Sequence, residues 1–244
     1  MINMVSPVDI LAFGAHPDDI ELSCCGTLLR HISFGKTVGL CDLTCGELGT
    51  RGTGERRLIE AEKARLLMGA SFRKNLGMED GFFEISKENL LKVIQLIRSS
   101  KPSIVFANAL KDRHPDHGKG AELVARACFL SGLLKIETFN ESGELQLPWR
   151  PRHVFHYIQD RNLTADFVVD ITEFMEKKME LIFCFSSQFY DPASIEPETP
   201  ISSKDFIMHI KAKNAWYARD IQTSYAEAFR VQKNIGISNV FDLV

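Results

Sequence analysis

The stretch VDILAFGAHPDD, residues 8–19, decides the fold of this chain. Its first half, VDILAF, is mostly apolar, which is typical of a strand buried inside a parallel sheet. Its second half brings His16, Asp18 and Asp19 directly after the end of that strand. In open parallel sheets, ligands bind beyond the carboxyl ends of the strands. Residues 8–19 therefore predict a buried first strand that leads into a functional site.

Strands and helices alternate along the rest of the chain. Short apolar runs predict strands, and longer segments with helical spacing of apolar residues predict helices. This alternation implies βαβ units, and therefore a Rossmann-like α/β fold with a mostly parallel, doubly wound sheet. Because there is no internal repeat and no low-complexity segment, residues 1–244 are predicted to form a single domain. We expect strands at 8–13, 37–44, 103–107, 154–158 and 167–169, and helices at 20–34, 55–68, 89–99, 120–129, 172–185 and 204–220.

The composition excludes several classes of partner. The chain has 244 residues, of which 45% are hydrophobic, and this is enough to bury a substantial core. Its formal net charge is -3 and charges of both signs are interspersed, so we expect no nucleic-acid partner. No apolar run reaches the roughly 18 residues that a membrane span needs, and the N-terminal residues lack the features of a signal peptide. We therefore expect no membrane partner.

The cysteines favour a reducing compartment. Cys24 and Cys25 are adjacent, and most of the six cysteines lie in apolar segments, so buried reduced thiols explain them better than disulfides. Cys41 and Cys45 have no second Cys/His pair at the spacing of a structural zinc site. We expect a cytoplasmic protein with free thiols.

A second polar cluster, DRHPDH at residues 112–117, follows the strand expected at 103–107. If the first strand and this one are neighbours in the sheet, the two clusters face each other across a crevice. His-Pro-Asp can also serve only as a turn and a helix cap, but two such clusters at matching strand ends favour a site. A dinucleotide loop is excluded, because the first turn lacks G-x-G-x-x-G and its two carboxylates would repel a pyrophosphate.

Metal chemistry explains the residue types of the two clusters. Zinc takes nitrogen, sulfur and carboxylate oxygen ligands, and a catalytic zinc site uses three of them plus water. Two histidines and one carboxylate meet this need, and a further aspartate can act as general base on the water, whose pKa the metal lowers to near 7. A remaining His-Asp pair can stabilise an oxyanion and protonate a leaving amine. The clusters therefore predict metal-assisted hydrolysis.

With AHPDD at 15–19 followed by HPDH at 114–117, the sequence resembles the PIG-L/LmbE-like zinc deacetylases, which remove N-acetyl groups from glucosaminyl conjugates. The resemblance covers nearly the whole chain, and the chain is similar to the bacillithiol-biosynthesis branch, which acts on N-acetylglucosaminyl malate. The segments that carry this finer likeness are AFGAHPDDIELSCCG, CDLTCGELGTRGT, DRHPDHGKGAELV, DFVVDI, SSQFYDP and SYAEAF.

The resemblance implies a role for each residue of the two clusters. Zn²⁺ would be held by His16, Asp19 and His117, and a His₂Asp set also accepts Fe²⁺ in the cell. Asp18 matches the general base. His114 matches the residue that steadies the tetrahedral intermediate, and Asp116 is expected to orient it. The implied catalytic set is thus Asp18, His114 and Asp116.

Three arginines are implied in substrate binding: Arg57, Arg113 and Arg150. Arginine suits this task because its planar guanidinium binds carboxylates bidentately, and malate carries two carboxylates. The resemblance also implies self-association as a homo-oligomer, commonly a hexamer. Two departures from the family pattern, Cys25 in place of a glycine and Ala228 in YAEAF, bear on how the substrate fits.

Two other functions remain open from the sequence. The first is a related amidase or deacetylase acting on another acetylated amino sugar or on a thiol conjugate. The second is a non-catalytic metal-binding protein on the same fold, which the presence of both Asp18 and His114 disfavours.

Overall fold

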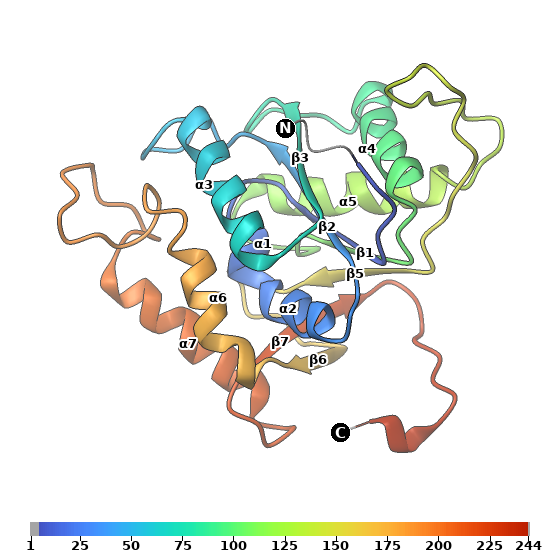
Figure 1. The fold of residues 1–244 in the computed structure, drawn as a ribbon. Helices are drawn as coiled ribbons and strands as arrows, with labels where there is room; N and C mark the ends of the chain where they lie inside the picture. The colour runs from blue at the N-terminus through green and yellow to red at the C-terminus, as the bar shows by residue number, and fades with distance from the viewer. Residues whose placement is uncertain (1–4, 244) are drawn as a thin grey trace.

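The computed structural model describes residues 5–243, which form a seven-stranded sheet with helices on both faces (Figure 1). The strands are β1 (Ile10–Gly14), β2 (Val38–Thr44), β3 (Phe72–Met78), β4 (Ile104–Ala107), β5 (His153–Tyr157), β6 (Phe167–Asp170) and β7 (Ala226–Val231). The α-helices are α1 (Asp19–Ser23), α2 (Cys25–Ser33), α3 (Gly54–Met68), α4 (Lys87–Ser100), α5 (Pro115–Leu130), α6 (Met175–Ile182) and α7 (Lys204–Ala218). Two short 3₁₀ helices are η1 (Thr172–Phe174) and η2 (Val240–Asp242).

The strand order is β3-β2-β1-β4-β5-β7-β6. β1 pairs in parallel with both β2 and β4, and Ile10 lies opposite Val38 on one side and Ile104 on the other. β7 is antiparallel to both of its neighbours, β5 and β6. The mostly parallel, doubly wound α/β fold is therefore confirmed. Because the connections run to opposite sides of β1 and β4, the loops after these two strands border a crevice.

The side chains of β1 alternate between the two faces of the sheet. Ile10 and Ala12 belong to a buried cluster with residues of α1, α2, α3 and α6, whereas Leu11 and Phe13 belong to a second cluster with residues of α4 and α5. Helices cover both faces of this strand, which explains why its sequence is a continuous apolar run. The core thus places the end of β1 at a rigid position.

The C-terminal third of the chain closes one side of the crevice. Tyr217 and Ala218 of α7 pack against Ala226 and Ala228 of β7 in a separate buried cluster. This packing fixes α7 beside the ends of the central strands. Consequently, α7 can contribute one wall of a cavity there.

Two strands and one helix break differ from the sequence prediction. The single helix expected at 20–34 is divided, because α1 ends at Ser23 and α2 begins at Cys25. β3 was not predicted, because it is an edge strand and its sequence FRKNLGM is largely polar. β7 was not predicted either, because it carries Glu227, a buried carboxylate that lies 2.6 Å from the ammonium of Lys178.

The expectations about thiols and membrane spans were also tested. All six cysteines are free thiols. Within residues 5–243, no helix combines the length and the apolar character that crossing a bilayer requires.

Candidate active site

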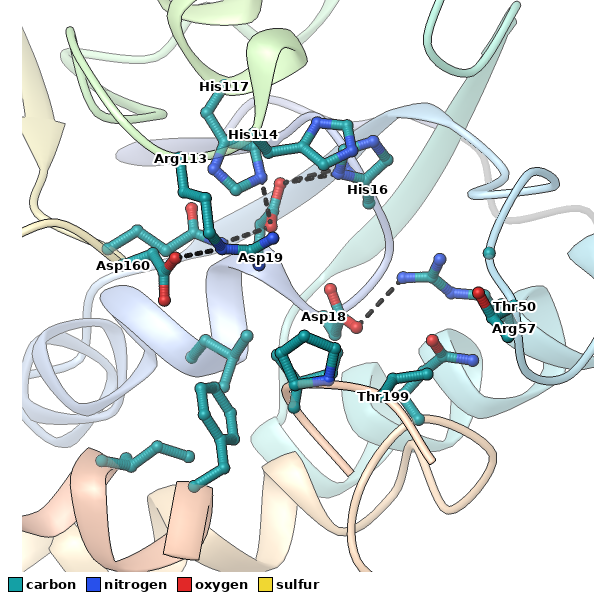
Figure 2. A pocket seen from close by; sticks show the side chains of 18 of the residues that line it. His16, Asp18, Asp19, Thr50, Arg57, Arg113, His114, His117, Asp160 and Thr199 are labelled. Atoms are coloured by element: carbon teal, nitrogen blue, oxygen red, sulfur yellow. Dashed lines mark hydrogen bonds and ion pairs between the residues drawn. The ribbon is translucent and has the colours of Figure 1, made fainter. Parts of the chain in front are cut away.

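The loops that follow β1 and β4 meet at one cavity of about 270 Å³ (Figure 2). His16 comes from the loop after β1, whereas His114 and His117 come from the start of α5, which follows β4. The ring centroid of His16 lies 4.5 Å from that of His114 and 5.5 Å from that of His117. The structure therefore brings the two polar clusters of the sequence together in one site.

The carboxylate of Asp19 lies between two of these histidines. Its Oδ2 is 3.6 Å from Nδ1 of His16, and its Oδ1 is 3.2 Å from Nε2 of His117. Asp19 is the buried first residue of α1, and the side-chain amides of Asn108 and Gln159 donate to its oxygens at 2.9 and 2.6 Å. These hydrogen bonds hold the carboxylate in place between the two rings.

The other ring nitrogen of each of these histidines meets a second carboxylate. Nδ1 of His117 lies 2.6 Å from Oδ2 of Asp112. Nε2 of His16 lies 3.0 Å from Oδ1 of Asp80 and 3.5 Å from Oδ2 of Asp116. Histidines that bind metals commonly give their second nitrogen to a carboxylate, which fixes the tautomer and the orientation of the ring. His16 and His117 both have this arrangement around Asp19.

Asp80 was missed by the sequence analysis. It follows β3, and it lies at the same edge of the sheet as the ends of β1 and β4. Its backbone N–H donates to Glu47 at 2.9 Å, and its Oδ2 accepts from the backbone N–H of Leu48 at 2.9 Å. Because β3 was not predicted from the sequence, no predicted strand end preceded Asp80.

The donor set fits a transition metal ion. One ring nitrogen from each of His16, His114 and His117 lies within 4.8 Å of the other two, and Asp19 contacts two of these rings. A second group of donors consists of His16, Asp80 and Asp116. Imidazole nitrogen and carboxylate oxygen are the donors that zinc takes in catalytic sites. The residues present therefore match the chemistry of zinc or of a similar divalent metal.

The carboxylates make this region strongly favourable for a cation. Burial disfavours the charged form of His16, but hydrogen bonding to Asp116 and Asp19 outweighs it and raises the pKa of His16 well above its ordinary value. Burial also acts against His117, whereas Asp19 and Asp112 raise its pKa to about 9. A metal ion competes with these protons for the same nitrogens, so the charge that holds the protons also favours the metal.

Asp18 lies beside this group and is held in a strained conformation. It is buried, and its backbone φ of 116° is in the left-handed region that residues with side chains rarely adopt. Arg57 Nη2 donates to Oδ2 of Asp18 at 3.0 Å (Figure 2). Burial raises the pKa of Asp18 to about 7, against the opposing effect of the Arg57 charge. A carboxylate with this pKa can both accept and release a proton near neutral pH.

Arg57 lines the cavity, but most of its donors contact the protein. The guanidinium donates to the backbone carbonyls of Pro17 and Gly46 as well as to Asp18. Gly46 has a positive φ of 65°, and a Cβ there would collide with Nη1 of Arg57. Arg57 therefore supports the loop that carries Asp18, and it also borders the space open to a ligand.

His114 is oriented differently from what the sequence analysis expected. Nδ1 of His114 caps α5 by accepting from the backbone N–H of Asp116 at 3.3 Å. The carboxylate of Asp116 instead accepts from the backbone N–H of Gly81 at 2.8 Å and lies near His16. Pro115 has no N–H, so the amide of Asp116 is the first in the helix that can bond the cap. In neutral His114, this bond places the ring proton on Nε2.

The three predicted substrate arginines lie in different places. Arg113 lines the cavity, and its Nε lies 2.5 Å from Oδ2 of Asp160 (Figure 2). Arg150 is exposed and lies elsewhere: its guanidinium is 4.4 Å from the ring centroid of Phe129 and donates to the carbonyl of Phe129 at 2.9 Å. The structure thus brings Arg57 and Arg113 to the cavity and places Arg150 on another surface.

The two departures from the family pattern lie in the core. Cys25 is buried at the start of α2, and its thiol donates to the backbone carbonyl of Glu21 at 3.1 Å. Ala228 is buried in β7 and packs in the cluster that contains Tyr217. Both substitutions therefore act on the packing behind the cavity.

Comparison with known proteins identifies the family that shares this geometry. A model of the PIG-L family, described as GlcNAc-PI de-N-acetylase, matches residues 11–128. The solved structure of the conserved protein TT1542 from Thermus thermophilus is 32% identical in sequence to this chain and has a TM-score of 0.83. The match covers 96% of this chain and 98% of that one. The chain belongs to the PIG-L family. The residues matched by the PIG-L model include His16, Asp19 and His117.

Two further relatives of this PIG-L protein carry the names of deacetylases. A protein of Escherichia coli K12 named uncharacterized deacetylase YaiS is 32% identical over 114 residues, which make up 44% of this chain and 61% of that protein. This match therefore spans less than two thirds of the E. coli protein. The structure of N,N'-diacetylchitobiose deacetylase from Pyrococcus horikoshii, complexed with its inhibitor, is 23% identical with a TM-score of 0.76, over 96% of this chain and 88% of that one. At this identity, the likeness shows a shared fold.

Proposed function

We propose that this PIG-L protein is a zinc-dependent N-deacetylase that removes the acetyl group from a glucosaminyl conjugate, and that its substrate is N-acetylglucosaminyl malate of bacillithiol biosynthesis. One observation carries the proposal: His16 and His117 each turn one ring nitrogen toward Asp19 and the other toward a second carboxylate. Histidine ligands of metal sites are commonly oriented in this way, and this supports the proposal.

We assign the metal to His16 Nδ1, Asp19 and His117 Nε2. The choice of Nδ1 in His16 follows from its other nitrogen, which is engaged by Asp80. His114 is not assigned as a ligand, although its ring lies near the other two, because its Nδ1 accepts the cap bond and the neutral ring then carries its proton on Nε2. When bound, zinc supplies a Lewis acid that acidifies water and polarises the amide carbonyl.

Asp18 is assigned as the general base. Its buried carboxylate borders the cavity beside Asp19, and its pKa of about 7 suits a group that must take up a proton from water and pass it on. Arg57 keeps this carboxylate in position through the hydrogen bond to Oδ2. The strained backbone at Asp18 is consistent with a residue placed for chemistry rather than for stability.

His114 is assigned to the oxyanion side of the reaction. Its Nε2 carries the ring proton and can donate to the oxygen that becomes negative when the acetyl carbon is attacked. Burial lowers the pKa of His114, and the charges of His16 and His117 lower it further. The neutral donor form is therefore favoured before the reaction, and the ring can assist proton transfer to the leaving amine.

The substrate class is supported by the cavity and by the relatives. Arg113 borders the cavity and offers a planar guanidinium for a carboxylate, as malate would require. The family model is described by an acetylated glucosamine conjugate, and the Pyrococcus horikoshii relative is named for an acetylated sugar. We further propose that the protein works in the cytoplasm as a homo-oligomer; its six free thiols support a reducing compartment.

A substrate panel tests this proposal. Acetate release would be measured with N-acetylglucosaminyl malate, N-acetylglucosamine, N,N'-diacetylchitobiose and an N-acetylated cysteine conjugate, each with the zinc-loaded protein. We expect the malate conjugate to give the highest kcat/KM. If acetate is released from another member of the panel but not from the malate conjugate, the proposed deacetylase activity stands and the proposed substrate is wrong. Release of acetate from none of them would refute the deacetylase.

A further inference from the structure

One wall of the cavity comes from α7, outside the segment that the PIG-L model matches. Phe206, His209, Ile210 and Lys213 of α7 all line the cavity. Their spacing of three, four and seven residues places them on one face of the helix. The proposed metal ligands and Asp18 line the same cavity from the matched segment. The α7 face is therefore a part of the site that the matched segment does not supply.

The cations that line the cavity differ in how far the protein satisfies them. Arg57 contacts Asp18, and Arg113 contacts Asp160. Lys213 donates to a neutral group, the backbone carbonyl of Gln159, at 2.5 Å. Among the side chains that the structure describes, no carboxylate lies within ion-pair distance of the Lys213 ammonium. Because an ammonium has three donors, Lys213 retains donors for a ligand.

The surroundings of Lys213 favour an anion at this position. The side chain is half-buried, and burial lowers its pKa to about 8, with Lys178 acting in the same direction. Glu227, Asp112 and Asp160 act in the opposite direction, from beyond ion-pair distance. Burial disfavours the charged form of the ammonium, and a negative group in contact with it would stabilise that form.

Lys213 is also close to the reacting end of the cavity. The carbonyl of Gln159 accepts from Lys213, and the side-chain amide of Gln159 donates to Asp19 at 2.6 Å. A single residue thus separates the ammonium from a proposed metal ligand. Lys213 and Asp19 line the same cavity, so one ligand there can lie between them.

We propose that Lys213 is the specificity-determining residue for an anionic substituent of the substrate, and that it binds a carboxylate on the group attached to the sugar. This inference rests on the proposed function for the identity of the sugar. Lys213 acts with Arg113: the arginine forms an ion pair with Asp160, whereas the lysine ammonium has no described carboxylate within ion-pair distance. The α7 wall thereby distinguishes charged conjugates from neutral ones.

The test measures binding without turnover. Calorimetry would give the Kd values of glucosaminyl malate and of methyl glucosaminide, the deacetylated forms of a charged and a neutral conjugate, for the zinc-loaded protein and its variants. Lys213→Met removes the charge and keeps the length of the side chain, and Lys213→Arg keeps the charge. Lys211→Met is the matched control, because Lys211 is on the same helix and lies 3.2 Å from Glu176 in an ion pair.

We expect Lys213→Met to raise the Kd of glucosaminyl malate by about tenfold, which is the effect of losing one hydrogen bond between charged groups. The Kd of methyl glucosaminide should stay unchanged. Lys213→Arg should restore most of the loss, and Lys211→Met should have no effect. In turnover, Lys213→Met should raise KM for the charged conjugate and leave kcat unchanged.

Equal weakening of both ligands by Lys213→Met, or no weakening of either, would overturn the inference. So would a wild-type protein that binds both ligands equally. If the wild type binds glucosaminyl malate through Lys213 but releases no acetate from any conjugate, the inference stands and the proposed deacetylase fails.

Discussion

Oδ2 of Asp112 lies 2.6 Å from Nδ1 of His117, on the side of the ring opposite Asp19. Asp112 is therefore the residue that fixes which nitrogen of His117 faces the proposed metal position. Carboxylates in this role raise the basicity of the histidine as well as orienting it.

Replacement of Asp112 is expected to weaken metal binding. In Asp112→Ala, the ring of His117 loses its partner on Nδ1, so we predict a roughly 10–100-fold increase in the Kd for zinc. A competition titration with a chromogenic chelator measures this value. Asp160→Ala is a matched control, because Asp160 is nearby but contacts Arg113 and neither proposed histidine ligand. An unchanged Kd for zinc in Asp112→Ala would show that Asp112 does not support metal binding by His117.

Removal of a proposed ligand is expected to abolish stoichiometric metal. The purified wild type should contain close to one divalent metal ion per chain, and His117→Ala should contain almost none after dialysis. His156→Ala is the control, because His156 is a buried histidine bonded to Asn108 outside the cavity. Elemental analysis of all three proteins decides the matter. Tight stoichiometric metal in His117→Ala would contradict the assigned ligand set.

Asp18 should matter for the reaction and little for the metal. Because Asp18 is assigned as the base rather than as a ligand, Asp18→Ala should keep its zinc and lose about 10²–10⁴-fold in kcat for deacetylation. Asp18→Asn should be similarly inactive, although it retains an oxygen that can accept from Arg57. Measurement of metal content and kcat on the same samples separates the two roles. Loss of metal together with activity would identify Asp18 as a ligand instead.

The two arginines that the structure separates should behave differently. Arg113 borders the cavity, so Arg113→Met should raise KM for N-acetylglucosaminyl malate by about tenfold. Arg150 packs over Phe129 on another surface, so Arg150→Met should leave KM unchanged in the isolated chain. Steady-state kinetics of both variants test this contrast. A larger increase for Arg150→Met would show that Arg150 reaches a substrate, for example from a neighbouring copy of the chain.

Arg73 is expected to contribute strongly to the free energy of unfolding, because it joins α1 and β2 through buried ion pairs. Its guanidinium lies 2.6 Å from Glu21 and 2.7 Å from Asp42, and all three side chains are buried. Arg73→Met leaves two buried carboxylates without their partner, so the free energy of unfolding should fall by about 3–5 kcal/mol. Urea denaturation of Arg73→Met measures this loss.

Arg126→Met is the control for Arg73→Met, because Arg126 forms an exposed ion pair with Glu122 and its removal should cost less than about 1 kcal/mol. Similar losses for both variants would refute the importance of the buried triad.

The sequence predicted five of the seven strands and the two polar clusters that line the cavity, because local patterns report both. The apolar run at residues 8–13 and the polar residues that follow it are adjacent in the chain, so β1 and its site loop could be read together. The second cluster follows β4 in the same way, and β1 and β4 are indeed paired.

What could not be predicted depends on contacts between distant segments. Asp80 follows β3, an edge strand whose largely polar sequence does not show the pattern of a strand. Its role depends on a contact with His16, which lies 64 residues away in the sequence. The orientation of His114 depends on a backbone amide, which sequence motifs do not report. Lys213 lies on a helix near the C-terminus, and its place at the cavity depends on the packing of α7 against β7.

Reconstitution with zinc tests whether deacetylation by this protein depends on the metal. Protein stripped with a chelator would be titrated with zinc while acetate release from N-acetylglucosaminyl malate is measured. The account predicts no release without metal and a linear rise that ends at one equivalent of zinc per chain. Acetate release from the stripped protein at the full rate, or no release at one equivalent while the zinc is bound, would contradict it.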